Sequence, residues 1–136
     1  MSIDPYLFFS GDCAAAFERY REVFGGELEV MTYADLPEGT ETTPGAEPHH
    51  VMHASLSFDD AVLMGSDDVT GDGGPKVGVA VAYTAPDEQA ARQAFDALAD
   101  GGEITMPFEA TFWSRGFGTC NDRFGIPWMV DTAGEP

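Results

Sequence analysis

The residues best suited to proton transfer or metal binding are the three histidines, His49, His50 and His53. Imidazole titrates near neutral pH and is the commonest metal ligand. The stretch 49–58 alternates apolar and polar residues, which predicts a β-strand. On a strand His49 and His53 share a face about 13 Å apart, and His50 points to the other face. One ion cannot bridge that distance, so we predict no local histidine metal site.

His53 is the strongest catalytic candidate among the three histidines. It shares the more polar face of the predicted strand with Ser55 and Ser57, whereas Leu56 and Phe58 occupy the apolar face. A histidine in that position could act as a general base or donate a hydrogen bond to a ligand. It could equally be a half-buried side chain satisfied by a neighbour, and the sequence leaves both readings open.

A second candidate region is 107–117, with the sequence PFEATFWSRGF. Glu109 is predicted there in a loop close to aromatic residues and to Arg115, and such surroundings can shift the pKa of a carboxyl in either direction. Trp113 could form one wall of a pocket for a flat ligand, or could instead plug the end of the fold. Arg115 could meet a ligand anion or pair with a surface acid.

The elements that must position these residues alternate between strands and helices. A strand at 4–9 precedes a helix at 13–24, whose Phe17, Tyr20 and Phe24 share one face. Asp12 is placed to cap that helix and Asp87 to cap a second one, in which Phe95 belongs to the buried face. The remaining strands are predicted at 27–34, 61–66, 78–84, 103–106, 116–121 and 128–132, with a long loop at 36–48.

The order of these elements occurs twice. A strand, a helix, a Gly-Gly pair and a further strand appear first around Gly25-Gly26 and again around Gly101-Gly102. We therefore predict one domain over 1–136, made of a pseudo-repeat at 1–68 and 76–136. The loop 67–75, rich in Asp and Gly, joins the two halves.

Charge and composition exclude several classes of function. The 24 acids and six bases give a formal net charge of −18. A field of that sign disfavours nucleic acid and anionic membrane as partners. With no signal-like start and no long apolar run, we expect a cytoplasmic protein. The acid excess could reflect a high-salt habitat, in which case the melting temperature rises between low salt and molar KCl.

The two cysteines, Cys13 and Cys120, are far apart and form no metal or disulfide motif. We expect two free thiols that are buried or half-buried.

Two segments carry a family resemblance: PYLFFSGDCAAAFERYREVFGGEL near the start and TFWSRGFGTCNDRFGIPWMVD near the end. The first resembles the opening of the PhnB-like branch of the glyoxalase/bleomycin resistance/dioxygenase (vicinal oxygen chelate) superfamily. The second resembles the closing motif of that branch. The motif comprises Trp113, Gly116, Phe117, Gly118, Asp122, Phe124, Gly125, Pro127 and Trp128.

The resemblance implies an α+β fold. It implies that two βαβββ modules form a curved mixed sheet around a cavity, with the helices outside, and that the protein is a homodimer. In many superfamily members a divalent metal is held by the first and last strands of each module. Those positions fall approximately at Pro5, Met64, Val79 and Met129. None is His, Asp or Glu, so we expect no cofactor and disfavour the superfamily metal.

The leading interpretation is a protein that binds a small molecule. The alternatives are a metal-dependent lyase, isomerase or dioxygenase of the same superfamily, and a structural or interaction module with a filled cavity. Catalytic roles are predicted for His53 and Glu109. The predicted ligand contacts are Leu7, Phe9, His53, Met64, Val79, Trp113, Arg115 and Met129.

Overall fold

A computed structural model describes residues 1–71 and 74–136 of the chain. The described residues form two compact units, Met1–Gly74 and Pro75–Pro136, each considered by itself below. The boundary falls within the Asp/Gly loop predicted to join the two halves. Asp72 and Gly73 of that loop lie outside the described residues.

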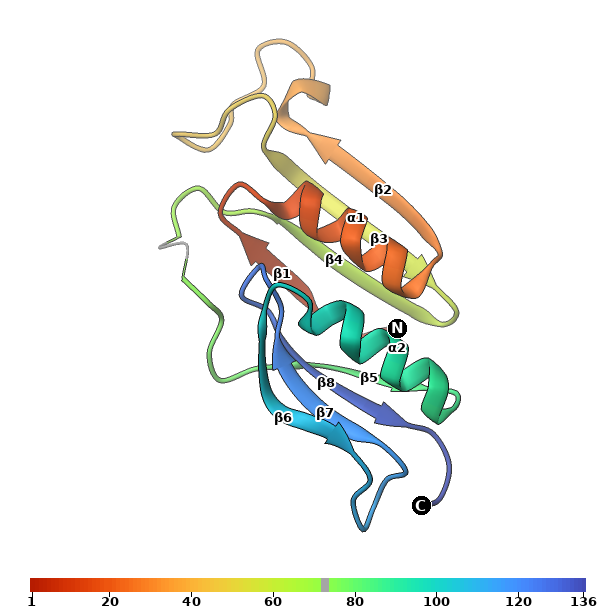
Figure 1. The fold of residues 1–136 in the computed structure, drawn as a ribbon. Helices are drawn as coiled ribbons and strands as arrows, with labels where there is room; N and C mark the ends of the chain where they lie inside the picture. The colour runs from red at the N-terminus through yellow and green to blue at the C-terminus, as the bar shows by residue number, and fades with distance from the viewer. Residues whose placement is uncertain (72–73) are drawn as a thin grey trace. The chain divides into compact units, whose positions relative to one another are not determined.

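The first unit has βαβββ order and one four-stranded sheet (Figure 1). Its strand order is β1-β4-β3-β2, and β1 runs parallel to β4 while the other neighbours are antiparallel. A short 3-10 helix, η1 (Tyr33–Asp35), follows the second strand. The elements are β1 (Tyr6–Phe9), α1 (Cys13–Phe24), β2 (Glu27–Thr32), β3 (Val51–Phe58) and β4 (Ala61–Asp67).

The second unit repeats that order and topology. The strand order of its sheet is β5-β8-β7-β6, and β5 runs parallel to its neighbour β8. The two mixed sheets with one helix each confirm the predicted α+β class. The elements are β5 (Val81–Ala85), α2 (Glu88–Ala99), β6 (Glu103–Glu109), β7 (Phe117–Asn121) and β8 (Pro127–Thr132).

Each helix covers one face of its own sheet, as the apolar spacing predicted. Phe17 of α1 and Phe95 of α2 are buried. A Cβ added to Gly65 of β4 would lie 2.7 Å from the Phe17 ring, and one added to Gly118 of β7 would lie 2.7 Å from the Phe95 ring. The glycines therefore let an aromatic ring settle directly on the sheet.

The repeated Gly-Gly pairs have a common physical cause. Gly25 and Gly101 have φ of +74° and +78°, which suits the end of a helix. The second glycine of each pair touches the backbone of the third strand of its unit. A Cβ would lie 2.2 Å from the Ser57 carbonyl oxygen at Gly26, and at Gly102 it would lie 2.1 Å from that of Asn121.

Five predicted strand boundaries are wrong by two residues or more. Strand β1 begins at Tyr6 rather than Asp4, and β2 ends at Thr32 rather than Ala34. Strand β3 begins at Val51 rather than His49, and β5 begins at Val81 rather than Gly78. Strand β6 continues to Glu109, beyond the predicted end at Met106. It passes through Pro107 because it is an edge strand with an irregular register there, where a missing N–H is tolerated.

The predicted capping by Asp12 is also wrong, whereas capping by Asp87 is confirmed. The Asp87 carboxylate accepts from Ala90 N at 2.8 Å. The Asp12 side chain makes no capping bond. Asp67, at the end of β4, takes that place and accepts from Gly11 N and Cys13 N.

Neither 12-residue helix of the described chain has the length and apolar character needed to cross a membrane.

Candidate functional site

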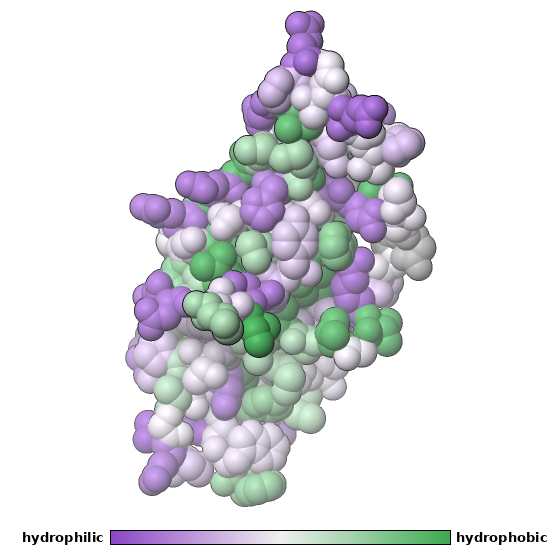
Figure 2. Space-filling model, turned by 180° about the vertical axis from the view of Figure 1, so that it is seen from behind, coloured by the Kyte–Doolittle hydropathy of each residue, from purple (hydrophilic) through white to green (hydrophobic). Residues whose placement is uncertain are grey.

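The open face of the first sheet, which is the side away from α1, carries the main candidate site. In the strand register Tyr6 lies opposite Met64, and Met64 lies opposite Ser55. His53 is two residues from Ser55 and therefore shares its face. In Figure 1 α1 lies on the viewer's side of this sheet, so Figure 2 looks onto the opposite face. Hydrophobic surface is interspersed there with hydrophilic surface (Figure 2).

Tyr6 of the edge strand β1 and His53 of β3 meet across β4 on this face. The Tyr6 hydroxyl lies 3.2 Å from His53 Nδ1, and the two rings stack with centroids 5.7 Å apart. Phe8 lies beside Tyr6, with ring centroids 5.2 Å apart. Tyr6 is 38% exposed and Phe8 is 48% exposed. Two aromatic surfaces and an imidazole edge are thus available to a molecule from outside.

The hydrogen bond between Tyr6 and His53 Nδ1 leaves Nε2 as the imidazole nitrogen for a ligand, and the tautomer decides whether Nε2 donates or accepts. When Tyr6 donates to Nδ1, the neutral ring carries its proton on Nε2 and can donate to a ligand. When Nδ1 carries the proton and donates to the phenol oxygen, Nε2 can accept a hydrogen bond or a proton. The pair can therefore bind either a donor or an acceptor.

The predicted ligand contacts of the first strand, Leu7 and Phe9, lie on the side of the sheet that α1 covers. Phe9 is 3% exposed and packs on Phe17 of α1 at a centroid distance of 6.0 Å. Leu7 pairs with Gly65, which also faces Phe17. Because 6–9 is apolar throughout, its sequence carries no alternation from which the facing could be read.

In the second unit, the predicted contacts Val79 and Met129 differ in their settings. Met129 lies opposite Ala82 and is 38% exposed on the face away from α2. Val79 precedes β5 and is 71% exposed, so its predicted place within a strand is wrong.

The region 107–117 forms the end of β6 and the connection to β7. Glu109 lies on β6 opposite Phe117, so the predicted loop position is wrong. Trp113 packs edge-on against Phe112 and Phe117, at centroid distances of 4.8 and 5.5 Å. Arg115 Nε donates to the Glu135 carbonyl oxygen at 2.6 Å. Among the described residues no ion pair joins Arg115 to Glu109.

Sequence reasoning missed Ser114, which organises this connection. Ser114 is 1% exposed. Its hydroxyl bonds to the Gly116 carbonyl oxygen at 2.9 Å and to the Asp131 carboxylate. Thr111 Oγ1 in turn accepts from Ser114 N at 3.1 Å. The only sequence signal was a serine within an aromatic stretch, which does not reveal burial.

In the closing sequence motif, Asp122 has a structural role as the acceptor of several hydrogen bonds. Asp122 is 6% exposed. Its Oδ1 accepts from Phe124 N and Ile126 N, and its Oδ2 accepts from Trp128 Nε1 at 2.9 Å. The motif therefore fixes the β7–β8 turn and the Trp128 indole.

Comparison with known proteins accounts for the fold and the motif together. The family model for the Glyoxalase/Bleomycin resistance protein/Dioxygenase superfamily matches residues 2–130. The chain belongs to this superfamily.

Similar proteins narrow the placement within the superfamily. Protein PA1353 from Pseudomonas aeruginosa is 36% identical, with 97% of each chain covered and a TM-score of 0.86. A structure from Bacillus cereus described as "Putative 3-demethylubiquinone-9 3-methyltransferase, PhnB protein" is 26% identical, covering 98% of this chain and all of its own, with a TM-score of 0.76. Protein YjdN of Escherichia coli K12 is 28% identical over 96% of this chain and 95% of its own length. These likenesses support the PhnB-like branch.

The superfamily's metal positions can be checked against the strand register. Pro5 precedes β1, and its carbonyl oxygen accepts from Met64 N. The register places Tyr6 opposite Met64 and Ala82 opposite Met129. Within the first unit this pair offers a phenol and a thioether, and within the second a methyl group and a thioether, none of which is a nitrogen, carboxylate or thiolate ligand of the kind that zinc, nickel or iron prefers. These residues do not fit the superfamily's metal.

The turn before α1 places backbone N–H groups at a helix N-terminus, an arrangement that often binds an anion. In this member of the superfamily, the Asp67 carboxylate accepts from Gly11 N at 2.9 Å and from Cys13 N at 3.0 Å. A negatively charged group therefore already occupies those donors.

Proposed function

We propose that the chain binds a flat, largely apolar small molecule on the open face of the first sheet. The observation that carries this proposal is the exposed, stacked and hydrogen-bonded pair of Tyr6 and His53, with Phe8 alongside. Aromatic faces supply most of the contact, and the imidazole fixes the orientation of one polar group.

Charge on the same face favours a neutral or cationic ligand. Alternation along the strands places Glu27 and Glu29 on this side, opposite Ser57 and Ser55. Among the described strand residues of this face there is no Lys or Arg. The chain as a whole carries a formal charge of −18. An anionic ligand would meet repulsion both nearby and at long range.

Three naphthalene compounds test this proposal: 2-naphthol, 2-naphthylmethylamine and 2-naphthoate. They share one ring system and differ in charge, and binding is measured by saturation-transfer NMR and equilibrium dialysis. We expect the neutral and cationic compounds to bind more tightly than the anion. Tyr6→Phe and His53→Gln should each weaken binding of the neutral compound about tenfold, the equivalent of about 1.4 kcal/mol.

His49→Gln is the matched control, because His49 precedes β3 and is outside the proposed face. Its affinity for the three compounds should equal that of the wild type. Equal affinities in His53→Gln and wild type would overturn the proposal, as would the absence of binding at millimolar concentration. Trp113, Arg115, Met129 and Glu109 stay predicted site residues and can be tested with the same compounds.

A further inference from the structure

We propose a metal site outside the superfamily's metal positions, formed by Glu47, His49 and His50. One ligand atom from each side chain lies within 4.8 Å of the others. Glu47 Oε2 is 3.4 Å from His49 Nδ1, and the two imidazole rings are 4.4 Å apart between centroids. These residues precede β3, so the strand geometry that kept the histidines apart in the sequence prediction does not apply to His49 and His50.

The backbone beneath these side chains is fixed from several directions. His50 N donates to the Glu47 carbonyl oxygen at 3.0 Å, which closes the turn. The carbonyl oxygens of Pro48 and His50 accept from Ala34 N and Tyr33 N. Val51, the next residue, is fully buried and donates to the Asp67 carboxylate at 2.8 Å. The site therefore needs only side-chain rotation to close on an ion.

The donor set defines the class of metal. Two imidazoles and one carboxylate match the three-ligand sites of zinc and similar transition metals, with the remaining position open to water. Ligand atoms at about 2.0–2.2 Å from an ion must approach each other more closely than 4.8 Å. Glu47 and His49 have side chains 64% and 66% exposed, so they are free to make that adjustment.

One existing hydrogen bond competes with metal binding. Glu47 N donates to His50 Nδ1 at 2.9 Å, so this nitrogen already presents a lone pair. Ligation through Nδ1 exchanges that bond for the metal, and water can reach the exposed Glu47 amide. The exchange costs little, because water replaces the imidazole as the partner of that amide. The preceding loop, 36–48, offsets this by its charge, because it contains Glu38, Glu41 and Glu47 and no basic residue.

Cobalt(II) is the probe for this site, because its visible spectrum reports coordination. Tag-free full-length protein is titrated with Co²⁺ and then with Zn²⁺, and bound metal is measured after desalting. We expect one Co²⁺ per chain and displacement by Zn²⁺ but not by Mg²⁺. His49→Gln, His50→Gln and Glu47→Gln should each weaken Co²⁺ binding at least about tenfold.

His53→Gln, at the histidine outside this cluster, is the control and should bind Co²⁺ as the wild type does. Circular dichroism spectra establish that each variant is folded. The proposal is overturned if the wild type retains no stoichiometric Co²⁺, or if His49→Gln and His50→Gln bind it unchanged. Naphthol binding repeated in EDTA separates this site from the proposed function, because the ligand face does not require the ion.

Discussion

The two units build the same sheet and secure it with different side chains. In each unit the last residue of the fourth strand reaches back to the start of the third. Asp67 accepts from Val51 N in the first unit, and Thr132 Oγ1 donates to the Gly116 carbonyl oxygen in the second. The carboxylate also captures the N–H groups before α1, whereas α2 is capped by its own Asp87.

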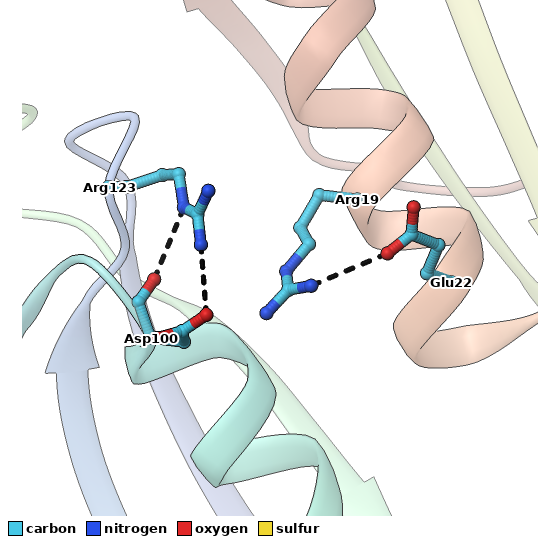
Figure 3. A network of polar contacts seen from close by, with 4 residues as sticks. All are labelled: Arg19, Glu22, Asp100 and Arg123. Atoms are coloured by element: carbon cyan, nitrogen blue, oxygen red, sulfur yellow. Dashed lines mark hydrogen bonds and ion pairs between the residues drawn. The ribbon is translucent and has the colours of Figure 1, made fainter.

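The contact between the end of the helix and the tip of the last hairpin differs as well. In the first unit Phe24 and Phe58 stack with centroids 5.0 Å apart and planes 5° apart. In the second, Arg123 donates to the backbone and side chain of Asp100, at 3.2 and 3.0 Å (Figure 3). Figure 3 also shows the Arg19–Glu22 ion pair, which lies within α1.

In both units a glycine lies close against the backbone of a neighbouring strand, but the side chains that secure the sheet differ. Asp67 and Thr132 end equivalent strands, so Met64 and Met129 are equivalent positions. Tyr6 pairs with Met64 and Ala82 pairs with Met129, so Ala82 is the counterpart of Tyr6. By the same register His53 corresponds to Phe117. The polar Tyr6–His53 pair is therefore particular to the first unit, which is where the proposed ligand face lies.

The largest expected effect tests the shared feature. Replacing Gly102 by Ala forces a methyl group against the Asn121 carbonyl oxygen and should lower the free energy of unfolding by about 3 kcal/mol. Gly26→Ala should cost about 4 kcal/mol, because Gly26 also has a φ of +90°. Urea denaturation followed by circular dichroism measures both.

Gly25→Ala is the control for these glycine variants. Gly25 has a φ of +74° but nothing within 4 Å of an added Cβ. It should therefore cost only about 1 kcal/mol. If Gly26→Ala cost no more than Gly25→Ala, backbone contact would not be the reason for the repeated pair.

The next largest effect is the difference in unfolding free energy lost on substitution of Asp67 and of Thr132. Asp67→Asn leaves the same volume but turns an amide N–H₂ toward backbone donors, which should cost about 3 kcal/mol of unfolding free energy. Thr132→Val removes one hydroxyl donor from a carbonyl that Ser114 also serves, so about 1 kcal/mol is expected. Equal costs in the same urea experiment would contradict the difference drawn between the units.

The helix-to-hairpin contacts should differ in their response to salt. Phe24→Ala should cost about 2 kcal/mol, with little change between low salt and molar KCl. Arg123→Met keeps an apolar stem and removes an exposed ion pair, so it should cost under about 1 kcal/mol, falling with salt. A salt-insensitive loss at Arg123 would mean that packing, rather than charge, closes the second unit.

The repeated order of the elements could be predicted because helix spacing and the Gly-Gly pairs recur and are set by local geometry, whereas the α+β sheet architecture was expected from the family resemblance. The sequence did not reveal the side on which Phe9 lies, because an all-apolar strand does not show which side faces the helix. It also failed at Asp67, whose capping partners Gly11 and Cys13 are distant in the chain. His53 could be selected from strand alternation, but its partner Tyr6 could not.

The smallest effect compares the buried thiols of the two units, Cys13 and Cys120. Burial raises the pKa of Cys120 to about 11, with Asp122 adding to the shift, and burial followed by the charges of Asp67 and Asp12 raises the pKa of Cys13 further. Well below pH 9, the ordinary pKa of a cysteine thiol, both thiols are protonated in the folded and unfolded chain. As pH rises above 9 the unfolded thiols ionise first, so stability is lost toward high pH. Between pH 9 and 10 each thiol should account for about 1 kcal/mol of that loss.

Cys120→Ala and Cys13→Ala should each remove their share of the loss, as measured by urea denaturation at both pH values. Other ionising groups cancel in the difference from wild type. Toward pH 11 the two variants should diverge, because folded Cys120 begins to ionise while folded Cys13 keeps its proton. A pH dependence unchanged in Cys13→Ala would show that its thiol ionises as easily in the folded chain as in the unfolded one. That result would contradict the burial of Cys13 at the start of α1, where its backbone N–H donates to Asp67.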